Sequence, residues 1–237
     1  MEIVVKLNNQ TAGRDKLARL LQYGSRAVWH LLEQKNHNRL LVTKLKSLEY
    51  NLSTFRKLLR LGRFLDVLYG ALSTMKHCDA TIRITLTLAK ISHAVFLLTD
   101  HLLWLGRAGL ARVDNKKWSR ISNKYWLYAI TMNLLRDAYE ICRIVNADPR
   151  LQAMIRGGQL SYASTFQSAF YIALIECMKD HKDIVIDTVK NACDMFIPMT
   201  ALGYTKLSPG LVGILGVVSS VAGILSMLNP LFKLSPA

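Results

Sequence analysis

The sequence predicts an all-α protein, a helical bundle associated with a membrane. Apolar residues recur at spacings of three and four along most of the chain, and no segment alternates convincingly as a strand would. Of the 237 residues, 51% are apolar, which excludes a disordered or collagen-like chain. The formal net charge is nevertheless +15, and this pairing of apolar and basic composition indicates a protein that sits on or in an anionic surface.

The positive charge is concentrated in the first half of the chain. Residues 1–124 contain 22 Lys and Arg against 8 Asp and Glu, whereas residues 125–237 contain 9 against 8. A basic front part and a near-neutral, apolar back part predict a surface-binding region followed by an inserted region. We therefore expect residues 1–83 to form a basic cytosolic region, with helices over 14–34, 38–50 and 53–76.

Residues 53–76 have the pattern of an amphipathic helix at a membrane interface. At about 100° per residue one face is apolar, while arginines gather on the opposite face with one lysine at its border. Such a helix inserts its apolar face between headgroups and acyl chains, and its cations hold anionic lipids. The candidate lipid-binding cations are Arg56, Lys57, Arg60 and Arg63. The candidate apolar contacts are Phe55, Leu58, Leu59, Leu65, Tyr69 and Leu72. The alternative is a bundle helix whose basic face is solvated.

Residues 84–106 are a possible first transmembrane or interfacial helix. The segment is apolar overall, but Lys90 and Asp100 would each cost about 2.5–3.5 kcal/mol near the centre of a bilayer. A helix packed in a bundle or lying at an interface accommodates these charges better than a lone span does. Residues 107–206 form a further helical region, with helices expected over 119–146, 159–178 and 181–196.

Residues 207–232 are expected to form a C-terminal transmembrane helix. This span contains no charged residue and is bracketed by Lys206 and Lys233. Its 20 residues from Gly210 to Asn229 would reach about 30 Å as a helix, which is the thickness of a bilayer core. Small residues at helical spacing let two membrane helices approach closely, and they predict self-association of the chain. The candidate association residues are Gly216, Ser219, Ser220 and Gly223. The alternative is a buried hairpin of a soluble bundle.

No motif indicates catalysis, a metal or a nucleic acid. The chain has no G-x-S-x-G, Walker loop or HExxH sequence, so we expect no enzyme, no catalytic residue and no cofactor. No CxxC pair and no Cys/His cluster with zinc spacing occurs, so no metal site is expected. Despite a pI near 9.9, no zinc finger, RNP-type strand or recognition helix is visible, and nucleic acid is not an expected partner.

Several motifs resemble the peroxisomal membrane protein 11 (peroxin 11) family. They are TAGRDK at residues 11–16 followed by Gln22-Tyr23, LSTFRKLLRLGRF at 52–64, and DHLLWLGR at 100–107. The apolar C-terminal stretch, rich in Gly and Ser, is also similar to that family. The resemblance runs essentially from end to end and is closest to the animal beta-type branch, although a glycine-rich insertion of some beta members is absent.

This resemblance implies an integral protein of the peroxisomal membrane, multi-pass or tail-anchored, with cytosolic termini. Members elongate peroxisomes before fission and proliferation, insert an amphipathic helix into the cytosolic leaflet and self-associate. The implied partners are an anionic phospholipid membrane, further copies of the chain, tail-anchored fission adaptors and a dynamin-related GTPase. Two alternatives stay open. One is a pore for small metabolites lined by Lys90, His93, Asp100 and Gln167, and the other is a passive adaptor that recruits the fission machinery.

Overall fold

The computed structural model describes residues 8–35, 39–147 and 178–229, together with the isolated positions 149, 175, 232 and 234. All regular secondary structure in this part of the chain is helical, which confirms the all-α prediction. The helices are α2 (Thr11–Gln34), α3 (Arg39–Leu59), α4 (Arg63–Thr74), α5 (Ala80–Arg107), α6 (Asn115–Ala147), α9 (Lys182–Leu202) and α10 (Pro209–Leu228). The helix expected over 159–178 lies almost wholly outside the described residues.

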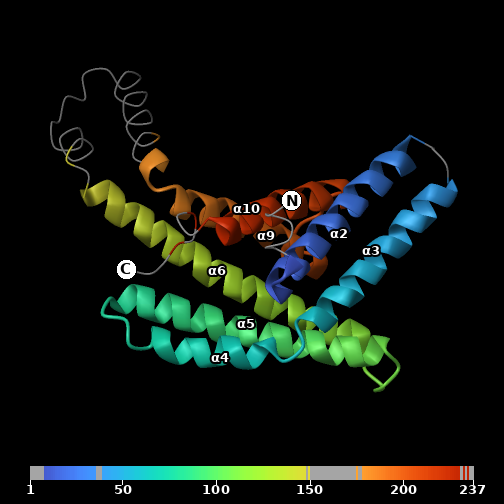
Figure 1. Ribbon diagram of the computed structural model, residues 1–237, viewed down its shortest axis with the longest axis horizontal. Helices are drawn as coiled ribbons and strands as arrows, with labels where there is room; N and C mark the ends of the chain where they lie inside the picture. Colours follow the sequence, from blue (N-terminus) through green and yellow to red (C-terminus); the bar gives the residue numbers. More distant parts are fainter. Residues whose placement is uncertain are drawn as a thin grey trace.

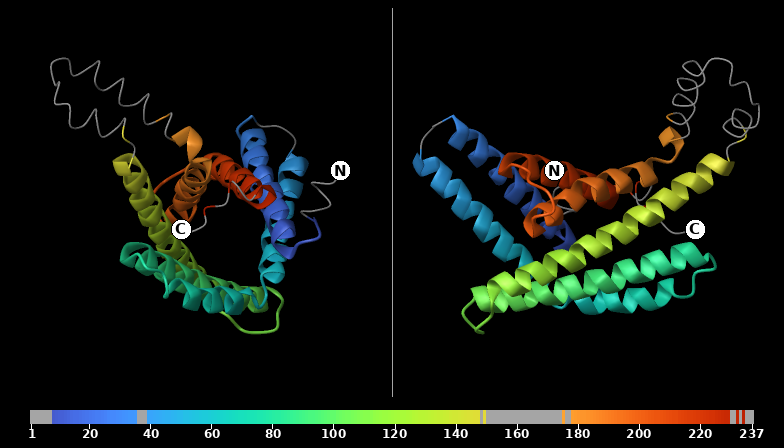
Figure 2. Two further views of the ribbon diagram at one scale, coloured as in Figure 1. Left: turned by 60° about the vertical axis from the view of Figure 1, so that its left-hand side comes forward. Right: turned by 180° about the vertical axis from the view of Figure 1, so that it is seen from behind.

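The helices form two connected groups (Figures 1 and 2). In the first group α4 packs on α5, and α5 lies along the long helix α6. In the second group α2 pairs with α3 as a hairpin and packs on α10, which in turn packs on α9. Contacts of α9 with α6 and of α3 with α5 join the two groups. The first and last described helices, α2 and α10, are thus direct neighbours.

The break between α3 and α4 differs from the prediction. α3 runs through Asn51, where we expected a boundary, and Thr54 Oγ1 donates back to the Tyr50 carbonyl at 3.1 Å. The continuous helix expected over 53–76 is wrong, because the chain turns at Gly62, whose φ is +77°. A left-handed backbone of this kind ends one helix and redirects the next, and glycine adopts it without steric cost.

The two apolar helices begin at side-chain caps. Asp79 accepts hydrogen bonds from the backbone N–H groups of Thr81 and Ile82 at the start of α5. Ser208 accepts one from Leu211 N at the start of α10, directly before Pro209, a residue well suited to the first helical position. Among the described residues, these two helices are long and apolar enough to cross a membrane.

The interior contains several charged side chains, and many large apolar side chains are exposed at the surface. The buried apolar cluster is small and centres on Tyr23, Ile197 and Val212. On α10, branched side chains point outward along one stripe. These exposed residues are Leu211, Ile214, Val218, Val221 and Leu225. Such an arrangement is favourable where lipid, rather than water, covers the outer faces.

Candidate functional site

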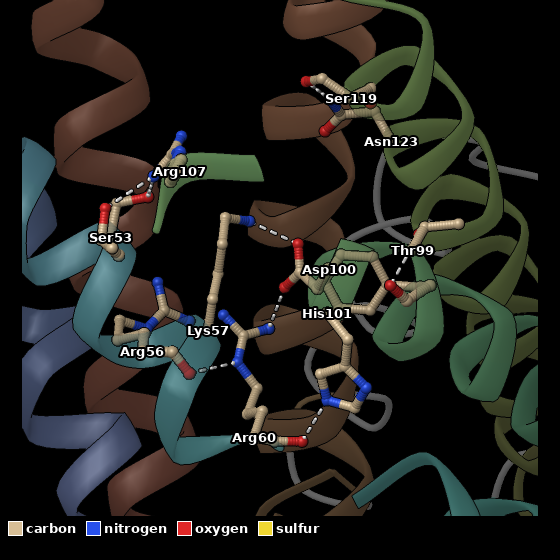
Figure 3. A network of polar contacts seen from close by, with 12 residues as sticks. Ser53, Arg56, Lys57, Arg60, Thr99, Asp100, His101, Arg107, Ser119 and Asn123 are labelled. Carbon is tan, nitrogen blue, oxygen red and sulfur yellow. Dashed lines mark hydrogen bonds and ion pairs between the residues drawn. The ribbon is translucent and has the colours of Figure 1, made fainter. Parts of the chain in front are cut away.

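A network of ion pairs joins α2, α3 and α5. Figure 3 shows its contacts between residues 56–60 and Asp100 and His101 of α5. Arg56 Nε donates to Asp15 Oδ1 at 2.9 Å, and its Nη1 donates to Gln22 Oε1 at 2.8 Å. Arg60 lies 3.5 Å from Asp15 and 3.1 Å from Asp100. Asp100 also forms an ion pair with the ammonium group of Lys57. Two carboxylates from α2 and α5 thus hold two cations of α3 and a third, Arg60, in the turn that follows it.

The same network fixes the turn that separates α3 from α4. His101 Nε2 on α5 lies 2.8 Å from the backbone carbonyl of Arg60, which also accepts a hydrogen bond from Arg63 N at 3.1 Å within the turn. The ring of Phe64, at the start of α4, packs edge-on against the imidazole, with 5.5 Å between the ring centroids. The direction of α4 is therefore set by α5 as well as by Gly62.

Further charged contacts attach α9 to its neighbours. Arg19 on α2 forms a paired contact with both carboxylate oxygens of Asp194. On α6, Arg136 and Asp137 contact Asp187 and Asn191 of α9, with Asn191 Nδ2 donating to Asp137 Oδ2 at 2.8 Å. Buried pairs of this kind are costly to break, because removing one partner leaves an uncompensated charge.

The surroundings shift the pKa values of several groups in this network. Burial acts to raise the pKa of Asp15, but the guanidinium groups of Arg60 and Arg56 outweigh it and lower that pKa to about 2. Burial, together with repulsion from Arg60, lowers the pKa of Arg56 to about 10. Burial also lowers the pKa of Lys16 to about 7, and the charges of Arg19 and Lys190 act in the same direction. Burial and the neighbouring charges thus act together on the protonation of these groups.

Stability is expected to rise with pH above neutrality because of Lys16. Since its pKa is about 7 in the folded chain and about 10.5 in the unfolded chain, the unfolded state binds more protons between these values. The free energy of unfolding therefore increases from pH 7 toward pH 10.5, and Lys16 adds at most about 1.4 kcal/mol per pH unit to this increase. Thermal melting of the detergent-solubilised chain at pH 7, 8 and 9 measures the slope. The Lys16→Met variant should have a flatter profile, and an unchanged slope in this variant would contradict the assignment.

The predicted lipid-binding residues divide between outside and inside. Most apolar members face outward, as expected: Phe55, Leu58, Leu65, Tyr69 and Leu72 are exposed, and Leu59 is half-buried. The basic members face the core: Arg56 and Arg60 are buried, and Lys57 and Arg63 are half-buried. The basic face expected at the headgroups is thus turned toward Asp15 and Asp100. These partners lie on other helices, so the periodicity of one segment could not reveal them.

The small residues of the C-terminal helix lie against α2 of the same chain. A side chain added at Gly216 would collide with the ring of Tyr23, and one added at Gly223 would lie 2.7 Å from Lys16 Nζ. Ser219 and Ser220 are completely buried. The face predicted to join two copies is therefore already covered, and self-association of the chain stays a prediction that needs another surface.

Two adjoining cavities lie beside the network. An inner cavity of about 220 Å³ is lined by Asp15, Lys16, Arg56, Arg60, Asp100 and other side chains. An outer cavity of about 720 Å³ shares Lys57, Leu103, Ser119 and Asn123 with it and adds three cations that sequence reasoning did not single out as a site. These cations are Arg107, Lys116 and Arg120. They come from two helices, and of the three only Arg107 belonged to a recognised motif.

The residues suggested for a pore are only partly brought together. His93 and Asp100 line the inner cavity. Lys90 instead donates to the Gly70 carbonyl at 2.7 Å, and Gln167 lies outside the described residues. Within the described ranges no three metal-ligating side chains gather.

Comparisons with known proteins agree over the whole chain. Residues 1–228 match the family Peroxisomal biogenesis factor 11 (PEX11). Peroxisomal membrane protein 11B of Homo sapiens is 32% identical, with full coverage of both chains, and peroxisomal membrane protein 11A of Bos taurus is 34% identical, with 99% of each chain covered. A peroxisomal membrane protein 11 homolog of Dictyostelium discoideum is 24% identical over 96% of this chain and 94% of its own.

The A and B types match about equally, so the assignment to a beta-type branch stays a prediction. No solved structure is significantly similar to the chain. The family match and the full-length relatives agree with the family resemblance seen in the sequence. The chain belongs to the PEX11 family of peroxisomal membrane proteins, which acts in peroxisome biogenesis.

Proposed function

We propose that this chain elongates the peroxisomal membrane by inserting the apolar face of residues 55–75 into the cytosolic leaflet, which promotes fission and proliferation. The observation that carries this proposal is the outward apolar stripe on α4. Leu65, Tyr69 and Leu72 are 58%, 79% and 58% exposed, and apolar side chains grouped in this way on a surface mark an interaction site.

The charged network orients the apolar side of α3, which precedes this stripe in the chain. Because Asp15 and Asp100 hold the basic side of α3, the opposite apolar side of α3 faces outward in a fixed orientation. Burying one large apolar side chain in the acyl region stabilises the bound state by about 1.5–3 kcal/mol. Helix volume added to one leaflet expands it relative to the other and favours positive curvature. The proposal keeps both termini on the cytosolic side of the membrane.

Mutation of the stripe tests the proposal. The full chain is reconstituted into vesicles that contain anionic lipid, and vesicle shape is recorded by electron microscopy. The Leu65→Gln/Tyr69→Gln/Leu72→Gln variant should lose most tubulation, because it removes the inserted apolar surface and leaves the ion pairs intact. The matched control changes three exposed apolar residues of α2, Leu21→Gln/Val28→Gln/Leu31→Gln, and should retain tubulation. Equal tubulation by both variants would contradict the role of α4.

Charge reversal of the arginines would be a poor test of the proposal. Arg60 is buried between Asp15 and Asp100, so an Arg60→Glu change would disrupt the fold as well as any lipid contact. The same preparation also separates the alternatives. A passive adaptor leaves bare vesicles round and acts only through fission proteins, whereas a pore gives conductance in planar bilayers.

A further inference from the structure

The outer cavity is lined by cations without a carboxylate. It lies where the middle of α3, the end of α5, the beginning of α6 and the end of α9 meet, and its volume is about 720 Å³. Its charged lining residues are Lys57, Arg107, Lys116 and Arg120. Ser119 and Asn123 of α6 add a hydroxyl and an amide to its wall (Figure 3). Every charged group on this wall therefore favours an anion.

Arg107 is held in place by neutral groups. Its Nη1 donates to Thr54 Oγ1 at 2.9 Å, and the guanidinium lies over the ring of Tyr50 at 4.8 Å from the centroid. Figure 3 shows this side chain reaching across to α3 beside Ser53. These contacts restrict the rotamer of Arg107 but neutralise none of its charge. A guanidinium fixed in this way retains N–H groups that match the oxygens of a phosphate.

The positive charge of the cavity has little compensation from the protein. Lys57 forms an ion pair with Asp100. Among the described residues, Arg107, Lys116 and Arg120 form no ion pair. The adjoining inner cavity contributes further cations, including Lys16, Arg56 and Arg60, against the carboxylates of Asp15 and Asp100. An anion of charge −2 or more in the outer cavity would relieve the mutual repulsion of these groups.

We infer that the outer cavity binds a phosphate-bearing anion, with Arg107, Lys116 and Arg120 as its principal ligands. A phosphoryl group offers several strong acceptor oxygens, which suits a site with a fixed arginine fork, two exposed cations and neutral polar groups. A soluble phosphate compound and the phosphorylated headgroup of a lipid share this chemistry. The inference is independent of the remodelling proposal, because binding is measurable in detergent, where no bilayer is bent.

Calorimetric titration of the purified full chain in neutral detergent tests the site. The soluble probes are inorganic pyrophosphate and inositol 1,4,5-trisphosphate. The Lys116→Gln/Arg120→Gln variant should weaken binding by about 10-fold or more, since hydrogen bonds to charged groups contribute at this level. The matched control, Arg112→Gln/Lys117→Gln, removes the same charge from two exposed neighbours outside the cavity lining and should change binding less than 2-fold. Arg107→Lys keeps the charge but loses the fork, and should weaken binding by about 3-fold or more.

A second measurement distinguishes the source of the phosphate. The chain is placed in phosphatidylcholine nanodiscs with or without 5% phosphatidylinositol 4-phosphate, and binding of the soluble probe is repeated. Competition by the lipid would support the site and assign it to a headgroup, and absence of competition would support it as a site for a soluble phosphate compound. No binding of either probe by the wild-type chain would overturn the inference. Equal weakening by the two double variants would also overturn it, since it would indicate diffuse surface charge.

Discussion

Replacing Asp100 with alanine is expected to destabilise the chain by about 3–5 kcal/mol, the usual result of removing one partner from a buried ion pair. Asp100 is 2% exposed and forms ion pairs with both Lys57 and Arg60. Without its carboxylate, Arg60 keeps Asp15 at 3.5 Å, but Lys57 loses its ion-pair partner. Thermal unfolding in detergent, followed by circular dichroism at several denaturant concentrations, measures the loss.

Two further variants make this result specific. Asp66→Ala removes an exposed carboxylate from the first turn of α4 and should change stability by less than about 0.5 kcal/mol. The double variant Lys57→Met/Asp100→Leu removes both members of the pair and should be more stable than Asp100→Ala, because no lone ammonium group remains. If the double variant were as unstable as Asp100→Ala, loss of packing rather than an uncompensated charge would be the cause.

Replacing Gly213 with leucine is expected to separate α10 from α2 at a cost of more than about 3 kcal/mol. A Cβ at Gly213 would lie 2.6 Å from the backbone nitrogen of Ala27 and 2.9 Å from its Cα. Because the obstructing atoms belong to the backbone, no rotamer change relieves the clash and the two helices must move apart. The neighbouring contacts of Gly216 with Tyr23 and of Gly223 with Lys16 would be lost with them.

The matched control is Gly24→Leu, the same substitution on the partner helix α2. A Cβ at Gly24 would meet no atom within 4 Å, and leucine favours a helix over glycine by up to about 1 kcal/mol. This variant should therefore be as stable as the wild type or slightly more so. Fluorescence melting of both variants in the same detergent gives the comparison. If the Gly213→Leu variant had the same melting temperature as the wild type, α2 and α10 would not be held together as described.

The sequence predicted the helices well and their mutual contacts poorly. Periodicity located α10 and α5, because apolar composition and length are local properties. It placed one boundary at Asn51 and ran a helix through Gly62, because the left-handed turn depends on contacts from His101 on another helix. The outward apolar face of Leu65, Tyr69 and Leu72 was likewise readable from spacing alone.

Local sequence patterns could not predict the ion pairs of the core. An arginine row on a helix is equally compatible with lipid headgroups and with carboxylates from distant segments. Asp15 and Asp100 lie 41 and 43 residues from the cations that they pair with, Arg56 and Lys57. Small residues on α10 similarly predict a close helix contact but do not say whether the partner is a second copy or, as here, α2.

The pairing of α2 with α9 and α10 has a consequence for synthesis of the protein. Arg19 meets its carboxylate partner 175 residues later in the chain, and α10 follows later still. At about 5–20 residues per second, translation needs roughly 10–35 s to supply that partner. Throughout this interval α2 lacks two of its partners. Asp194 is not yet present to pair with Arg19, and the glycine-lined face of α10 is not yet present to pack on α2. Until α9 and α10 have been synthesised, this face of the N-terminal helix is therefore uncovered by the helices that pack on it in the folded chain.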